Sequence, residues 1–434
     1  MKKLMIIFSL SVLGLTNVYC QNEASNYLYR CNEKLIDVIM EDIFTPPVAS
    51  RVHVYPNIAA YEVLCKKNKS LTTLCTQLKE LDSISDPVGK VDYSLSACLA
   101  FTTVAKKLVY SEYLFKDFET VEIKNWLLLN NNDTLLLHNS VDYGKAVAQQ
   151  IIAWIKKDHY SYTRTLMRYV LNDSLGAWRP TSPDYANALE PNWPLMRSFV
   201  FDSTNKIMPK PNLAYSENKK SEYYKNAMAV YKQSMELDST KKEIASFWDC
   251  NPNITKYNGH LTYFVHKVSP GGHWLRIAGQ ACKNLQLDEY KTAEVYTMVT
   301  IGIYEAFLNC WSCKYVCNAV RPETYINRLI APKWRPLIET PPFPEYTSGH
   351  STVSSTSATI LTALIPQPYA YTDSSEMYIN LPPRHFNNFK EAAAEASISR
   401  FYGGIHYMPA LNNGLEHGAA IGTYLLKKII ITQP

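Results

Sequence analysis

Three short stretches in the last third of the chain carry polar residues of the types that bind anions. The first, WSCKYVCNAVRPETY, places Lys314 and Arg321 seven residues apart. On one continuous helix these two cations would share a face, with Pro322 ending or bending the helix just after Arg321. Two cations on one face repel each other unless an anion lies between them, so the spacing indicates an oxyanion site.

The second stretch is PPFPEYTSGHS, in which three prolines precede Ser348, Gly349 and His350. Small residues and apolar residues at helical spacing follow, so this motif is predicted to begin a helix. The free N–H groups and the positive end of the helix dipole favour an anion at that point. A hydroxyl, a closely approachable glycine amide and an imidazole would meet there.

The third stretch, SRFYGGIHYMPALNNG, gives Arg400 and, six residues later, His406 beyond a bend at Gly403 and Gly404. An arginine can clamp oxyanion oxygens with two parallel N–H groups, and a neutral imidazole can bind the central atom. Taken singly, each of these residues could be a solvated charge, a helix cap or a satisfied loop histidine. Together they favour one shared site built by the C-terminal half.

Helical periodicity dominates the elements that must position these residues. Strand patterns are scarce and short, and residues 172–211 and 330–346 are expected to be irregular because prolines cluster in them. We interpret the chain as one mostly helical protein in two parts, a scaffold over residues 21–265 and a chemistry-bearing part over 266–434. Helices are expected at residues 27–43, 58–65, 95–110, 143–155, 223–235, 278–281, 292–311, 352–364, 389–401 and 415–430.

Composition and the N-terminus restrict the partners and the compartment. The 434 residues carry a formal net charge of +5 without a long basic run, which argues against a nucleic-acid partner. Residues 1–20 resemble an export signal, with Lys2 and Lys3 before an apolar stretch, and a lipid anchor on Cys20 is less favoured than cleavage. No later segment is long and apolar enough to predict a membrane span. The mature protein is expected in a periplasm or outside the cell.

The cysteines and one further histidine are given structural interpretations. Cys310, Cys313 and Cys317 would lie on one side of a helix, and no second ligand cluster follows them. A zinc site there is not expected, so these three form a packing stripe with room for one disulfide. His273, in SPGGHW, is predicted at a helix start and is expected to pack against Trp274.

The three stretches, taken in order, resemble the three-part signature of the type 2 phosphatidic acid phosphatase and vanadium-dependent haloperoxidase superfamily. The matching residues are Lys314, Arg321-Pro322, then Ser348-Gly349-His350, then Ser399-Arg400 and His406. Trp311 and Phe343 match the haloperoxidase branch. PPVASRVHVYPNIAAYE and GAWRPTSPDYANALEPNW resemble secreted bacterial haloperoxidase-like proteins. The resemblance implies an all-α fold of two packed four-helix-bundle-like halves.

The resemblance also implies a role for each matching residue. His406 would be the ligand of vanadium or the nucleophile toward phosphorus, and His350 the acid-base residue. In a haloperoxidase the cofactor would be vanadate, the substrates hydrogen peroxide and halide, and Lys314 would also polarise the bound peroxide. The groups that would bind vanadate or phosphate oxygens are Lys314, Arg321, Ser348, the Gly349 amide and Arg400, while Trp311 and Phe343 would wall the halide side.

One departure from the family pattern separates the alternatives. Ala410 stands where the phosphatases have an aspartate that orients the histidine, which counts somewhat more against a phosphatase than against a haloperoxidase. Candidates to replace that aspartate are Asn412, Asn413 and Glu416. Three functions therefore stay open: a vanadate-dependent haloperoxidase, a cofactor-free soluble acid phosphatase that forms a phospho-histidine, and a non-catalytic oxyanion-binding relative.

Overall fold

The computed structural model describes residues 27–202, 207–252, 254–258 and 260–432. The expected export signal and the Cys20 anchor lie outside these residues. The described chain is mostly helical, with two small two-stranded sheets, so the predicted all-α class is confirmed. None of its described helices combines the length and the apolar character that crossing a bilayer requires.

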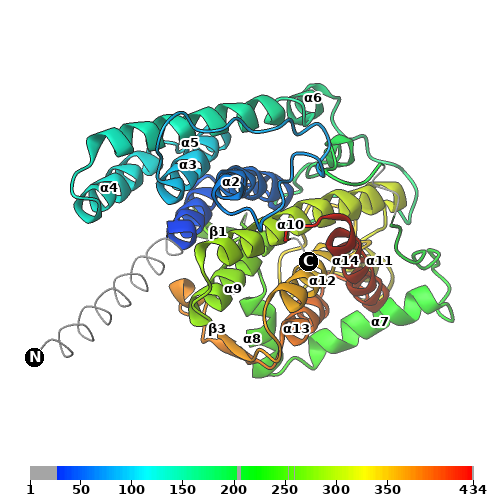
Figure 1. The fold of residues 1–434 in the computed structure, drawn as a ribbon. Helices are drawn as coiled ribbons and strands as arrows, with labels where there is room; N and C mark the ends of the chain where they lie inside the picture. The colour runs from blue at the N-terminus through cyan, green and yellow to red at the C-terminus, as the bar shows by residue number, and fades with distance from the viewer. Residues whose placement is uncertain (1–26, 203–206, 253, 259, 433–434) are drawn as a thin grey trace, which may run out of the picture.

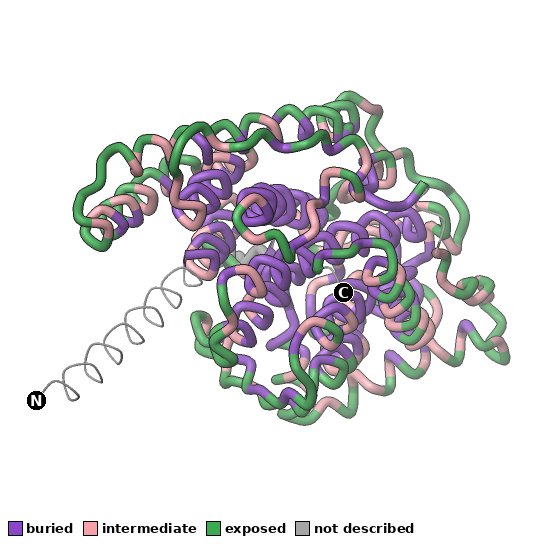
Figure 2. Tube along the Cα trace, in the orientation of Figure 1, coloured by how far each residue is buried: buried purple, intermediate pink, exposed green. Residues whose placement is uncertain are grey.

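Two long helices form the centre of the molecule, α2 (Pro46–Lys67) and α10 (Glu289–Cys317), which pack against each other (Figure 1). Every residue from 292 to 314 of α10 is buried, as is every residue from 47 to 65 of α2. A helix that is buried all round needs no polar face, so neither shows a clear amphipathic stripe. Figure 2 shows both as buried rods inside more exposed neighbours.

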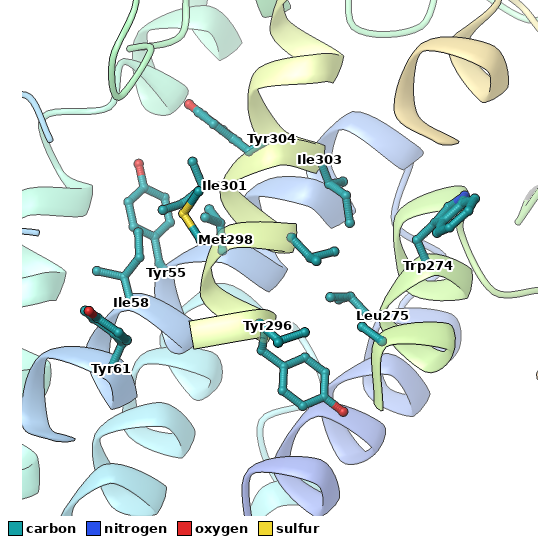
Figure 3. Close-up of a cluster of buried hydrophobic side chains, with 14 of the residues drawn as sticks. Tyr55, Ile58, Tyr61, Trp274, Leu275, Tyr296, Met298, Ile301, Ile303 and Tyr304 are labelled. Atoms are coloured by element: carbon teal, nitrogen blue, oxygen red, sulfur yellow. The ribbon is translucent and has the colours of Figure 1, made fainter. Parts of the chain in front are cut away.

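The N-terminal half packs around α2. A helix over residues 27–41 joins it through paired amides of Asn32 and Asn57, and α3 packs on α2 and α5. Figure 3 shows where α2 and α10 meet, with Tyr55 and Ile58 of α2 near Met298 and Ile301 of α10. The other elements before residue 266 are α3 (Tyr93–Leu108), α4 (Leu114–Leu129), α5 (Thr134–Ile155), α6 (Tyr160–Thr165), η1 (Trp193–Leu195), α7 (Glu222–Met235), α8 (Ser239–Phe247), β1 (Ile254–Asn258) and β2 (Leu261–Val265). Of these, α7 and α8 pack against α13 (Phe389–Tyr402) of the C-terminal half (Figure 1).

The C-terminal half packs around α12 (Gly349–Leu364), which contacts α10, α13 (Phe389–Tyr402) and α14 (Met408–Lys428). Glycines let α14 approach α12 closely, because a Cβ at Gly418 would lie 2.2 Å from the Thr352 carbonyl oxygen. The remaining elements are α9 (Pro270–Asn284), α11 (Pro322–Leu329), β3 (Tyr371–Asp373), η2 (Met377–Ile379) and β4 (Arg384–Phe386). The boundary between residues 265 and 266 stays a prediction, since α10 packs against both halves.

The prediction that Lys314 and Arg321 share one helix face is wrong. Helix α10 ends at Cys317, where Asn318 takes a left-handed backbone conformation (φ 46°) and its N–H bonds to the Lys314 carbonyl. Arg321 is the N-cap residue of α11, and Pro322 begins that helix. The proline therefore starts a second helix instead of ending the first.

Helices α4, α6, α8 and α11 were not predicted, and residues 172–211 and 330–346 are largely irregular as expected. All nine cysteines of the described residues are free, so the disulfide allowed for in the 310–317 stripe does not form. Cys310 and Cys313 are buried and Cys317 is exposed.

Candidate active site

The loop over residues 340–348 and the start of α12 form the floor of the site. Ser348 is the N-cap of α12, and its Oγ accepts a hydrogen bond from the Ser351 N–H at 3.3 Å. Gly349 follows at the first helical position. A Cβ added there would meet only the Trp311 ring, at 3.6 Å, so the missing side chain leaves open space in front of the helix N-terminus.

Lys314 is fully buried beneath this loop, and its ammonium group donates to three backbone carbonyls. The distances from Nζ are 2.9 Å to Pro344 O, 3.1 Å to Glu345 O and 2.5 Å to Thr347 O. Burial and the Arg321 charge lower the pKa of Lys314 to about 8, against the raising effect of Cys310 and Glu345. Lys314 therefore supplies positive charge and fixes the loop, with its three donors already used.

Arg321 contacts the same aromatic ring as Lys314. Lys314 Nζ and Arg321 Cζ are each 4.9 Å from the Phe343 ring centroid, so this ring stabilises both cations. Arg321 Nη1 is 2.9 Å from Ile405 O and 3.1 Å from His406 Nε2. Its Nη2 is buried and has no hydrogen-bond partner within the described residues.

Arg400, near the end of α13, brings the third cation. Its Nη1 donates to Trp248 O at 2.6 Å and its Nη2 lies 3.6 Å from Asp249 Oδ1, while its buried Nε has no partner among the described residues. The chain then turns at Gly403 and Gly404 toward His406. A Cβ at Gly403 would lie 2.2 Å from Ile338 Cδ1, and Gly404 has φ 78°, so both positions require glycine.

His406 is oriented by Glu345, a residue that the sequence analysis did not assign. Its Nδ1 lies 2.8 Å from Glu345 Oε1, which also accepts the Tyr407 N–H at 3.1 Å. Because Oε1 already accepts from Tyr407, it also accepts from Nδ1, so Nδ1 carries the proton and the Nε2 lone pair accepts from Arg321 Nη1. Burial, followed by the charges of Arg321, Lys314 and Arg400, lowers the pKa of His406 well below its ordinary value, so the imidazole is neutral.

Glu345 takes the place of the aspartate that the chain lacks at Ala410, so the three candidates predicted for that role are wrong. The orienting carboxylate comes from the loop before α12, and not from Asn412, Asn413 or Glu416. Asn413 donates to Tyr346 Oη, and Glu416 pairs with Lys210. The motif PPFPEYTSGHS contained the signal, since Glu345 is its only acid. Its burial raises the pKa of Glu345 to about 7, against the lowering effect of Arg321 and Lys314.

His350 completes the polar side of the site. It follows Gly349 in the first turn of α12, and its ring forms a hydrogen bond with the backbone of Trp248. Its Nε2 is buried without a partner among the described residues. Burial and the neighbouring Arg400, His273 and Lys314 lower the pKa of His350 well below its ordinary value, so this ring is also neutral and can accept a proton.

These residues surround one pocket with largely apolar walls. Of the residues predicted from sequence, six line it and three, Lys314, Arg321 and Ser348, lie directly behind that lining. The lining includes Trp311, Phe343, Gly349, His350, Arg400 and His406, together with Leu189, Cys250, Phe307, Pro341 and Pro342. The structure thus brings the three predicted stretches together, and the roles assigned to the residues stay predictions.

The scaffold half also contributes to the site, which the sequence analysis missed. Trp248 and Asp249 bind Arg400, and Cys250 lines the pocket. The missed acid Glu339 lies at the same pocket, where burial and then the carboxylates of Asp184, Asp249 and Glu323 raise its pKa to about 7. No spacing rule links residues 248–250 to Arg400, because the contact depends on tertiary packing of α8 against α13.

Comparison with known proteins places the chain and its fold in a family. Residues 294–431 match the family model described as the VCPO second helical-bundle domain. The crystal structure described as that of the first bacterial vanadium-dependent iodoperoxidase is 37% identical, with a TM-score of 0.89, over 94% of this chain and 98% of that one. The chain therefore belongs to the vanadium-dependent haloperoxidase superfamily, as its signature indicated.

More distant structures agree in fold. The holo and apo forms of a bacterial vanadium-dependent chloroperoxidase have TM-scores of 0.66 and 0.63, each at 13% identity. They cover 89% and 88% of this chain, and 93% and 94% of their own. A search of curated proteins gives no match.

The Glu345 contact predicts the effect of one substitution on anion binding. Glu345→Gln keeps an acceptor for Nδ1 but removes the charge that fixes the tautomer, so we expect vanadate affinity to fall about 10–100-fold. Calorimetric titration measures this. Glu416→Gln, at the exposed position considered from sequence, should bind vanadate like the parent protein. Equal affinity in Glu345→Gln and the parent would contradict the assignment.

The lowered pKa of Lys314 predicts a pH dependence. Lysine is charged below its pKa and neutral above it, so affinity for a dianion should fall as pH rises through about 8. One linked proton gives up to about a tenfold loss per pH unit. Tungstate is a suitable probe because its charge is constant over this range. Lys314→Gln should bind more weakly and lose this slope, whereas an unchanged slope in a folded variant would contradict the prediction.

Proposed function

We propose that this protein is a vanadate-dependent haloperoxidase that oxidises halide with hydrogen peroxide. One observation carries the proposal: unpartnered buried nitrogens of Arg321, Arg400 and His350 occur around a neutral, oriented His406 beside an aromatic-walled pocket. Iodide is the first halide to test, because the similar structure at 37% identity is described as an iodoperoxidase.

The residues present fit vanadate. Within the described residues, Arg321 Nη2 and Arg400 Nε are buried donors without a partner, and open space at Gly349 adjoins the N-terminus of α12. His406 Nε2 would bind vanadium with the lone pair that accepts from Arg321 Nη1 in this structure, and Nη1 would keep its contact with Ile405 O. The Nδ1–H···Glu345 contact is the support that a histidine ligand normally has. Vanadate, when bound, supplies the Lewis-acid chemistry by which peroxide becomes able to oxidise halide.

The side chains have distinct tasks in this proposal. His406 anchors the oxyanion, and Arg321 and Arg400 bind its oxygens. Lys314 donates to the carbonyls of Pro344 and Thr347, so it acts on the oxyanion through its charge. The family resemblance implied a direct contact between Lys314 and bound peroxide. The Trp311 and Phe343 rings, with centroids 4.9 Å apart, wall the side where a large polarisable halide would approach.

His350 moves the proton. His350 lines the pocket, and its neutral Nε2 has no hydrogen-bond partner among the described residues, so it can accept a proton from entering hydrogen peroxide and return it during turnover. The overall reaction is H₂O₂ + X⁻ + H⁺ → HOX + H₂O, in which halide loses two electrons and the peroxide bond accepts them. The proton consumed comes from solvent through this acid-base group.

A phosphatase is the second candidate, and Glu345 is the observation that favours it. A neutral His406 with Nδ1–H bonded to a carboxylate is also the nucleophile that phosphoryl transfer needs, so Ala410 no longer counts against this reaction. The experiment is to assay the purified protein with vanadate, peroxide and iodide, then bromide, and separately with nitrophenyl phosphate without vanadate. Halide oxidation is expected. Ester cleavage alone would overturn the ranking, and vanadate binding without either activity would favour a non-catalytic relative.

Two substitutions separate anchoring from proton transfer. His406→Ala should abolish halide oxidation and vanadate anchoring together, because it removes the nitrogen ligand. His350→Ala should keep vanadate binding and lower kcat about 10²–10⁴-fold, the usual contribution of an acid-base group. Vanadate titrations and steady-state kinetics on both variants measure this. Equal losses of vanadate affinity would show that the division of roles is wrong.

A further inference from the structure

A second cluster of ligand-type side chains lies behind the pocket and has no part in the oxyanion chemistry. Cys250 Sγ is 3.4 Å from His273 Nδ1, which is 3.2 Å from Glu376 Oε1. All three ligand atoms lie within 4.8 Å of one another, and the three residues are buried. They come from the segment after α8, the first turn of α9 and the turn after β3, so only the folded chain assembles them.

The histidine is held through its Nε2, so Nδ1 is the nitrogen that faces the cluster. His273 Nε2 is 2.8 Å from Asp373 Oδ2, and Ser375 fixes that carboxylate by donating to its Oδ1 through both N–H and Oγ. Ser375 Oγ also lies 2.7 Å from Nε2, so Nδ1 is the nitrogen directed at Cys250 and Glu376. Burial lowers the pKa of His273, but Asp373 and Cys250 outweigh it and raise that pKa well above its ordinary value, so a metal at Nδ1 would replace a proton. A carboxylate behind the histidine is the usual support of a metal ligand. The ring stacks on Trp248 at 4.5 Å and 13°, in place of the expected contact with Trp274.

A second observation indicates an unsatisfied ligand. Glu376 Oε1 is buried and has no hydrogen-bond partner within the described residues, although it lies 3.2 Å from Nδ1. The two atoms are close but not arranged as a hydrogen bond. Bond lengths of about 2.3 Å to sulfur and about 2.0–2.1 Å to nitrogen and oxygen place tetrahedral ligands about 3.6 Å (S···N) and about 3.3 Å (N···O) apart. The observed separations of 3.4 and 3.2 Å are close to these values.

We propose that Cys250, His273 and Glu376 bind one Zn²⁺ ion. The thiolate, the imidazole Nδ1 and the carboxylate supply three ligands, a set typical of zinc, and water completes four. Binding releases the Cys250 thiol proton and the His273 Nδ1 proton to solvent, and the zinc–sulfur and zinc–nitrogen bonds replace the Cys250···His273 contact. The ion reaches the cluster from the pocket, since Cys250 lines it.

The ion would fix the position of residues 248–250, which contact Arg400. Trp248 O and Asp249, the two residues before Cys250, are the protein partners of Arg400. Zinc would thus link α9 and the β3 turn to the wall of the oxyanion site without touching the oxyanion. This inference does not rest on the proposed function.

The test is zinc binding by the full chain after removal of metals with a chelator. Zn²⁺ titration against a chromogenic chelator and elemental analysis should give one ion per chain. Asp373→Asn should weaken binding about 10–100-fold, and Cys250→Ser and Glu376→Gln should weaken it at least as much, because they remove ligands. Cys282→Ser is the matched control, a buried cysteine on α9 outside the cluster, and it should bind like the parent.

Cobalt gives an independent readout on the parent protein if a variant fails to fold. Bound Co²⁺ should show a thiolate-to-metal charge-transfer band, which Cys250→Ser loses and Cys282→Ser keeps. His406→Ala should retain the zinc, which separates this site from the vanadate anchor. Absence of stoichiometric zinc, equal uptake by Cys250→Ser or Glu376→Gln, or a cobalt spectrum without the thiolate band would overturn the proposal. In those cases His273 is a metal-free bridge between two carboxylates.

Discussion

Burial of three cations around one histidine is the constraint on which the site depends. Lys314, Arg321 and Arg400 have exposed fractions of 0, 0 and 3%. Among the described residues, the nearby carboxylates are those of Asp249 and Glu345. Removing an ion from water costs several kcal/mol unless partners compensate for it. Backbone carbonyls, the Phe343 ring, Asp249 and Glu345 compensate in part. The remaining buried N–H groups and the net positive field favour an oxyanion, which ties stability of this region to ligand binding.

Three element ends bring the buried cations and the two histidines together. The buried end of α10 carries Trp311 and Lys314, the N-terminus of α12 presents Gly349 and His350, and a two-glycine turn after α13 delivers His406. The scaffold half closes the arrangement, because the residues after α8 bind Arg400 from behind. Precision of the site therefore depends on packing between the halves as well as on the C-terminal motifs.

Much of this could be predicted from the chain alone, for physical reasons that differ by residue. Helical periodicity gave the fold class, and the N-cap pattern at Ser348 placed the start of α12 correctly. Arg321 was placed on the wrong helix, because a proline after a helical pattern either ends one helix or begins another, and sequence does not separate the two. The left-handed Asn318 decides it in the structure.

The contacts of Glu345 and of the Cys250 cluster could not be predicted from sequence. Glu345 was visible inside the key motif, but its direction toward His406 depends on the path of an irregular loop. The partners of His273 lie about 20 and 100 residues away in the chain, so no local spacing could reveal them. Contacts of this kind follow from tertiary packing, which local patterns do not encode.

A crystal structure of the protein soaked with vanadate tests the central claim most directly. The account predicts vanadium bonded to His406 Nε2, with Arg321 and Arg400 contacting its oxygens and Glu345 still bonded to Nδ1. Vanadate bound elsewhere, or a site that stays without it at saturating concentration, would contradict the account.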